Sequence, residues 1–236
     1  MTQAVDVSFR NTGRVEARRM IGSSVAEVVM VVSLLGAFAL MTLKGTAAID
    51  SIKAYLMIRQ FQAFQSAVMT YQAQFGSLPG EDGGAPRRYL RPPSTLARAG
   101  MQISLIGNGA LDGELYDQLS PNSETFMAWR DLRYFEAIPG DPKVAGASAM
   151  PENPFGGFYG FDQGNLGQKG GSLCATRISG RAAQMIDNRL DDGKINTGDV
   201  VATSKFSIEQ NHHFDAPDTT PYDFEKEYII CVPMLP

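Results

Sequence analysis

Side chains that carry out catalysis or bind metals are scarce in this sequence. Histidine occurs twice, as the adjacent pair His212 and His213 in a polar stretch, with no cysteine or carboxylate at the spacing of a zinc site. There is no Gly-x-Ser-x-Gly motif, no phosphate-binding loop and no His-Glu-x-x-His motif. We therefore interpret the two histidines as exposed surface residues and expect a protein that is not an enzyme.

An excess of positive charge is also missing. The formal net charge of the 236 residues is −4, so the sequence has none of the basic footprint that nucleic-acid binding requires. Residues 1–22 are the exception, because they hold four arginines against two acidic residues. The hydrophobic content of 44% suits a folded protein with a real core.

Cysteine occurs only twice, at Cys174 and Cys231, both in the C-terminal third. An even number favours one disulfide and therefore an oxidising compartment. Such a bond would close a 57-residue loop and contribute roughly 4 kcal/mol in the chain-entropy model. Two buried free thiols are the alternative.

Residues 1–22 lack the apolar core of a secretory signal peptide, and the apolar run comes after Gly22 instead. Ser23–Leu43 would be about 31 Å long as a helix, enough to cross a bilayer core of about 30 Å. Arg18 and Arg19 precede this run. The positive-inside rule therefore predicts a single membrane pass with the N-terminus in the cytoplasm and the C-terminal bulk outside.

Glu27 is the one acidic residue inside the apolar run. An unpaired carboxylate in a membrane costs a few kcal/mol at mid-bilayer and less near the interface. One interpretation is that Glu27 is kept for contact between subunits. The other is an interfacial glutamate that snorkels to the surface in an ordinary membrane anchor.

The helix is predicted to continue beyond Ile49 with a different character. Aromatic and aliphatic residues recur at alternating spacings of three and four, with glutamines between them, which predicts an amphipathic helix packed on a globular body. Gly76 and Pro79-Gly80 are typical of a helix end. The prediction is one helix of about 50 residues. The recurring positions are Phe61, Phe64, Val68, Tyr71 and Phe75.

The remaining chain is predicted to mix helices and strands. Residues 80–110 are rich in turn residues, and Leu111–Ala137 has helical spacing around Trp129, which we assign to core packing. Gly, Pro and aromatic residues alternate over 138–171, which indicates strands or an ordered loop. Arg181–Leu190 is predicted to be a short helix, and Tyr228–Val232 a final strand.

One run resembles a metal-binding loop. Asp191, Asp192, Asn196 and Asp199 place oxygen ligands around Gly193, an arrangement that could hold Ca²⁺. There is no bidentate glutamate at the spacing of an EF-hand loop. A structural turn and a calcium site both remain open.

The N-terminal constellation resembles the type IV pilins and the related pseudopilins of type II secretion. It consists of a basic leader ending at Gly22, Glu27 at the fifth position after it, and Gly36 at the fourteenth. Tyr71–Gly80 is similar to the end of the long pilin helix with its Leu-Pro-Gly turn. Further short matches, in the expected order, are Gly107-Asn108-Gly109, Trp129-Arg130-Asp131-Leu132 and Leu190-Asp191-Asp192-Gly193.

The resemblance implies an α+β, pilin-like fold in which a long N-terminal helix, half transmembrane and half amphipathic, packs on a C-terminal domain with an antiparallel sheet. It divides the chain into a cleaved leader (1–22), a transmembrane and assembly helix (23–43), the amphipathic half (44–79) and a globular domain (80–236). A prepilin peptidase would cut after Gly22 and leave Ser23 as a methylated N-terminus. The protein would lie in the bacterial inner membrane and then in an extracellular or periplasmic filament.

The resemblance also implies how subunits assemble. Glu27 would neutralise the Ser23 amine of a neighbouring subunit, and Gly36 would lie in the contact between helices. The partners would be like subunits in a helical filament, the peptidase, and the inner-membrane assembly platform of a pilus or of type II secretion. The alternative is a single-span, membrane-anchored binding or enzyme domain in the periplasm that does not assemble.

Overall fold

A computed structural model describes residues 24–85, 109–113, 115, 123–164, 166, 171–205 and 216–235, without the side chains of 40–46. Gly22 and Ser23, the leader before them, Gly107-Asn108 and the two histidines lie outside the described residues. The chain forms two compact units, Met1–Lys44 and Gly45–Pro236. Each unit is described by itself.

The longest element is helix α1, Val25–Phe75, with 51 residues, so the predicted length of about 50 residues is confirmed. It contains no proline, which would interrupt it. It ends at Gly76, whose φ of 72° is the left-handed conformation typical of the residue after a helix. The Gly76 amide donates to the carbonyl oxygen of Gln72 at 2.8 Å and completes the last turn.

The predicted membrane pass is wrong for the part of the chain that the structure describes. No helix there is both long and apolar enough to cross a membrane. The predicted single-pass location in a bacterial inner membrane, which depended on that span, is therefore wrong as well.

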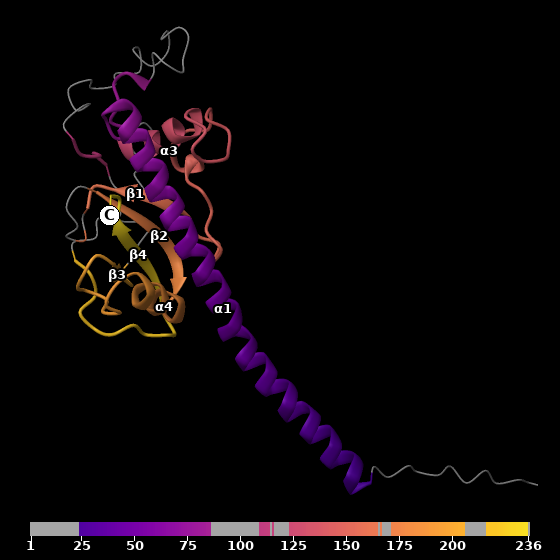
Figure 1. The fold of residues 1–236 in the computed structure, drawn as a ribbon. Helices are drawn as coiled ribbons and strands as arrows, with labels where there is room; N and C mark the ends of the chain where they lie inside the picture. The colour runs from indigo at the N-terminus through magenta and orange to yellow at the C-terminus, as the bar shows by residue number, and fades with distance from the viewer. Residues whose placement is uncertain are drawn as a thin grey trace, which may run out of the picture. The chain divides into compact units, whose positions relative to one another are not determined.

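The unit Gly45–Pro236 is an α+β domain (Figure 1). Its described strands form a four-stranded antiparallel sheet in the order β1-β2-β4-β3, so the C-terminal strand lies inside the sheet. The described strands are β1 (Tyr159–Asp162), β2 (Ser172–Ser179), β3 (Val201–Thr203) and β4 (Glu227–Pro233). The described helices besides α1 are α3 (Glu124–Tyr134), the 3-10 helix η2 (Gly146–Ala149) and α4 (Gly180–Leu190).

The predicted final strand and the helix over Arg181–Leu190 are confirmed as β4 and α4. The helix predicted over Leu111–Ala137 is wrong in extent, because α3 covers only Glu124–Tyr134 and the described residues 109–113 are not helical. Gly113 has a φ of 131°, which no helix contains. The hydrophobic spacing therefore continued through the non-helical conformation at Gly113.

Alternation along the strands gives the sheet two apolar faces. One face, with Tyr159, Phe161 and Leu173, belongs to the main core together with α1 and α3. The rings of Phe61 and Phe64 on α1 meet the Tyr159 ring edge to face at 5.4 and 5.1 Å. The predicted stripe on α1 therefore packs on the sheet.

Polar side chains also fix α1 to the domain. Tyr159 donates its hydroxyl to Gln60 Oε1 at 2.6 Å, and Gln65 Nε2 donates to the carbonyl oxygen of Pro233 at 2.8 Å. Because hydrogen bonds depend on direction more than apolar contacts do, these two set the position of α1 along the sheet. The sequence had suggested a polar outer face for the glutamines.

Candidate functional site

The first turns of α1 expose many large apolar side chains, which we name together the apolar strip. Its nine large apolar side chains are between 51% and 80% exposed. Contiguous exposed apolar surfaces mark interaction sites, since water exposure of this kind is unfavourable. The strip consists of Val25, Val28, Val29, Met30, Val31, Val32, Leu34, Leu35 and Phe38.

Glu27 begins the helix that carries the strip. Its carboxylate accepts a hydrogen bond from the Ser24 amide at 2.9 Å, while the Ser24 hydroxyl accepts one from the Glu27 amide at 3.3 Å. This reciprocal pair is a capping box, which satisfies amides that the first helical turn leaves open. The Ser24-x-x-Glu27 spacing was the sequence signal for it, and sequence reasoning missed it.

In the capping box the Glu27 carboxylate accepts a hydrogen bond from the amide of Ser24, the residue that follows Ser23 in the sequence. Ser23 is the residue that the resemblance makes the new N-terminus. Gly36, the other predicted assembly residue, has no atom within 4 Å of the position that a Cβ would take. A second helix can therefore approach α1 closely at this point.

The two cysteines form a disulfide between neighbouring strands. Cys174 on β2 and Cys231 on β4 face each other in the strand register and are bonded. Both are buried on the second face of the sheet with Leu115, Val201 and Ile229, opposite the face that packs on α1. The bond therefore holds the last strand in the sheet, and the prediction of a disulfide is confirmed.

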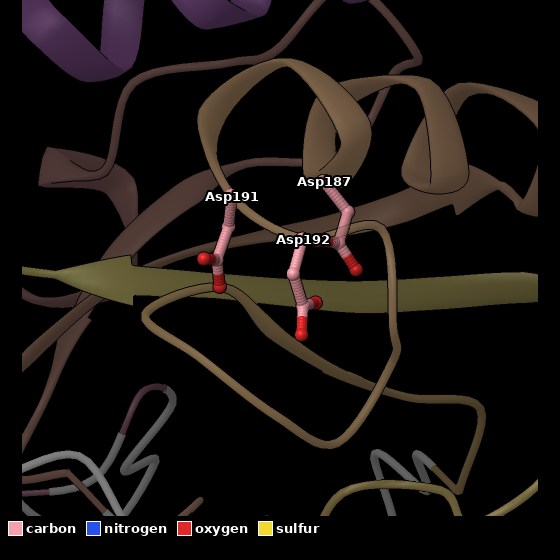
Figure 2. A group of neighbouring side chains, drawn as sticks. All are labelled: Asp187, Asp191 and Asp192. Atoms are coloured by element: carbon pink, nitrogen blue, oxygen red, sulfur yellow. The ribbon is translucent and has the colours of Figure 1, made fainter.

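Three carboxylates meet where α4 ends, those of Asp187, Asp191 and Asp192 (Figure 2). Their oxygen atoms lie within 4.8 Å of one another. Asp187 was not among the predicted calcium ligands, although it lies one helical turn before Asp191. The predicted ligands Asn196 and Asp199 are exposed in the following loop.

The carboxylates of this cluster already accept hydrogen bonds from the loop. Asp191 Oδ2 accepts from the amides of Asp199 and Val200 at 2.6 and 3.0 Å. Asp192 accepts from the Lys194 amide and from the Thr197 hydroxyl, a bond that lowers the Asp192 pKa. These bonds hold the loop against the end of α4.

Asp187 is fully buried and holds a different partner. The Tyr222 hydroxyl donates to its Oδ2 at 2.7 Å, and the Gly193 amide to its Oδ1 at 2.9 Å. Burial raises the Asp187 pKa, and the charges of Asp192 and Asp191 add to this effect. Burial and the nearby Asp187 also raise the pKa of Tyr222.

A second group of acidic side chains is buried where the end of α1 meets the start of α3. Glu81, Glu124 and Asp131 are at most 6% exposed. Asp131 Oδ2 accepts from the Gly80 amide at 2.9 Å, and Glu124 Oε2 accepts from the Asp112 amide at 2.8 Å. Sequence reasoning missed this junction, because it joins residues far apart in the chain.

The Glu124 carboxyl has an unusual protonation equilibrium. Burial raises its pKa from 4.5 to about 7. The hydrogen bond from the Asp112 amide lowers the pKa, while the negative charges of Asp112 and Glu81 raise it further. The junction is thus sensitive to pH near neutrality.

Comparison of the chain with known protein families, with curated proteins and with solved structures finds no match.

Proposed function

We propose that this protein is a structural subunit of a filament of the type IV pilus or type II secretion kind, cleaved after Gly22 by a prepilin peptidase. The observation that carries the proposal is the exposed apolar strip at the start of α1, with Glu27 as its one charged residue. Like subunits that pack these strips together would form the filament core.

The energetics favour a role in assembly. Burial of one large apolar side chain contributes about 1.5–3 kcal/mol relative to full exposure. Covering nine of them contributes on the order of 10 kcal/mol, before the entropy cost of association is subtracted. A catalytic site would gain nothing from such a surface, whereas a subunit contact would be stabilised by it.

The fold is compatible with a pilin-like subunit. The second half of α1 packs its apolar stripe on an antiparallel sheet, and a disulfide fixes the last strand. This packing of one half of the helix on the sheet supports the proposal of a pilin-like subunit. The cysteine pair favours a type IV pilus subunit over a type II secretion pseudopilin.

Glu27 has a specific role in this proposal. In the single chain its carboxylate caps its own helix at the Ser24 amide. In the assembly it neutralises the amine of Ser23, the residue before Ser24 in the sequence, of a neighbouring subunit. A charge left unpaired in an apolar contact is strongly penalised, so the pair enforces one register between subunits.

A matched set of variants tests this role. Glu27→Gln removes the charge but keeps an acceptor that a capping box tolerates, and we expect it to abolish filaments while the chain stays folded. Glu27→Val is expected to do the same. Ser24→Ala removes only the side-chain half of the cap and should leave filaments intact.

The readout is electron microscopy of sheared filaments, with circular dichroism to confirm the fold of each variant. Normal filaments from Glu27→Gln would overturn the assigned role of the carboxylate. A wild-type chain that binds a ligand or substrate as a single subunit and never assembles would favour the alternative, an unassembled binding or enzyme domain.

A further inference from the structure

A pocket lies at the end of α3, within the unit Gly45–Pro236. Its volume of about 590 Å³ falls in the range of about 300–1,000 Å³ that is typical of ligand pockets. Two of its lining side chains are charged, those of Arg133 and Glu136. The rest of the lining is largely apolar and includes Tyr134, Ile138, Pro139 and Pro142. The pocket therefore has the size and the mixed lining of a site for a short peptide or a small ligand.

The guanidinium of Arg133 is incompletely paired. Nε donates to the carbonyl oxygen of Pro139 at 3.3 Å, and Nη2 donates to that of Ala149 at 2.5 Å. Gly140 leaves room for this arrangement, because a Cβ there would lie 2.5 Å from Nε. Nη1 is buried and has no hydrogen-bond partner in the part of the chain that the structure describes. Because a buried donor without a partner is unfavourable, an acceptor supplied by a ligand would stabilise this side chain.

The positive charge of Arg133 is also incompletely compensated. Both of its acceptors are neutral carbonyl oxygens. Burial lowers the Arg133 pKa, and the negative charge of Asp141 offsets this only in part. A carboxylate in the pocket would supply both a countercharge and a hydrogen-bond acceptor, and its planar geometry matches that of a guanidinium.

Glu136 lines the same pocket from an unfavourable backbone conformation. Its φ is 59°, in the left-handed region that favours glycine. Its amide donates to the Arg133 carbonyl oxygen and the Ala137 amide to that of Leu132, both at 3.0 Å. These two bonds are the Schellman motif that ends a helix, in which glycine is the usual residue at this position. An exposed glutamate there is explained when its carboxylate has a function.

The two charges define the ligand. An anionic ligand would pair with Arg133 but would be repelled by Glu136, and a cationic ligand would pair with Glu136 but would be repelled by Arg133. A molecule that carries a carboxylate and a cationic group close together pairs with both. A basic residue at the C-terminus of a peptide has these two groups, and the residues before it can pack on the apolar lining.

We propose that this pocket binds the C-terminus of a peptide that ends in a basic residue, with the terminal carboxylate at Arg133 and the cationic side chain at Glu136. To bond the carboxylate through Nη1, the guanidinium turns toward the pocket and gives up the long bond from Nε to Pro139. Every lining residue belongs to the unit Gly45–Pro236, so binding does not require the assembly proposed above. The pocket adds a recognition function to the subunit.

Isothermal titration calorimetry of the full chain in mild detergent tests the pocket with three peptides. Ala-Ala-Lys is the probe, its C-terminal amide lacks the carboxylate, and Ala-Ala-norleucine lacks the ammonium group. We expect amidation to weaken binding by about tenfold or more, the effect of losing a charge-assisted hydrogen bond. Replacing lysine by norleucine should weaken binding by about fivefold, the effect of losing an exposed ion pair.

Variants assign the two contacts, with circular dichroism to confirm each fold. Arg133→Gln removes the charge, and we expect it to bind the free and the amidated peptide equally. Glu136→Gln should bind Ala-Ala-Lys about fivefold more weakly than the wild type does. Glu136→Lys should reverse the preference and favour Ala-Ala-Glu over Ala-Ala-Lys. Glu225→Gln, at an exposed glutamate that does not line the pocket, is the control and should bind like the wild type.

Glu136→Gly tests the interpretation of the backbone conformation. Glycine adopts a positive φ without strain, so this variant should melt about 2–4 °C higher than the wild type. It should also lose the preference for lysine over norleucine. A variant that melts at a lower temperature and keeps that preference would show that the glutamate is there for stability, which would overturn its assigned role.

The remaining outcomes are distinct. A wild-type chain that shows no saturable binding of Ala-Ala-Lys, or that binds the free and the amidated peptide equally, would overturn the proposal. Binding that neither Glu136→Gln nor Glu136→Lys changes would do so as well. Each of these results would leave the proposed function standing, because the filament variants test it separately.

Discussion

Replacing Glu124 by glutamine should make stability less dependent on pH. Glu124 is 6% exposed, and burial raises its pKa from 4.5 to about 7. The folded state therefore holds this proton more tightly than the unfolded state does. Stability is highest below pH 4.5 and falls as the pH rises to about 7, because only the unfolded chain gains from ionisation.

The size of the effect follows from the two pKa values. The difference between 4.5 and about 7 corresponds to about 3 kcal/mol of unfolding free energy. Glutamine still accepts the hydrogen bond from the Asp112 amide but carries no charge. Glu124→Gln should thus match the wild type near pH 4.5 and exceed its stability by about 3 kcal/mol near pH 8.

Urea unfolding of the oxidised protein measures this difference. Trp129 is the one tryptophan of the chain and is fully buried, so its fluorescence reports unfolding. Glu225→Gln, at an exposed glutamate, is the control and should have the same effect at both pH values. A Glu124→Gln variant that is less stable than the wild type near pH 8 would refute the reasoning.

The domain supports four further predictions. Replacing Cys174 and Cys231 by serine should lower the free energy of unfolding by about 4 kcal/mol, because the loop of 57 residues is no longer closed; an unchanged urea midpoint would contradict this. Gly80→Ala should cost about 3 kcal/mol or more, since its Cβ would lie 2.2 Å from the Glu124 carbonyl oxygen at a φ of 88°. Gly76 has a φ of 72° but no atom near the position of a Cβ, so Gly76→Ala should lower the free energy of unfolding by only about 1 kcal/mol. Equal losses for the two alanine variants in urea unfolding would exclude the contact with the Glu124 carbonyl oxygen as the cause of the larger effect. Calcium should leave the melting temperature unchanged, because the Asp191 and Asp192 oxygens already accept loop hydrogen bonds; a rise that Asp191→Asn removes would establish the calcium site.

The long helix could be predicted from the sequence because its signals are local. Phe61, Phe64, Val68 and Tyr71 recur at helical spacing, and all four are buried against the domain. The disulfide could be predicted from the cysteine count. Both predictions succeeded because neither depends on knowing which distant segments of the chain meet in the fold.

The polar contacts could not be predicted in the same way. Gln60 lies among glutamines that look alike in sequence, yet it accepts a hydrogen bond from Tyr159, a residue 99 positions later. Glu124 likewise becomes unusual only because the fold buries it near Glu81. Such contacts depend on tertiary packing, which hydrophobic spacing does not specify.

The candidate site was predicted in part. The Ser24-x-x-Glu27 pattern is a local capping signal that was present but not used. Asp187 joins Asp191 and Asp192 because α4 continues to Leu190 and places it one turn away. The predicted membrane location, which was inferred from an apolar run alone, was wrong, because no described helix is both long and apolar enough to cross a membrane.

The central claim, that the chain is processed and assembled into a filament, is tested most directly by N-terminal sequencing and intact-mass measurement of subunits from sheared filaments. The account predicts a chain that begins at Ser23, with residues 1–22 removed. Filament subunits that keep residues 1–22 would contradict it, and so would cells that make this protein but form no filaments containing it.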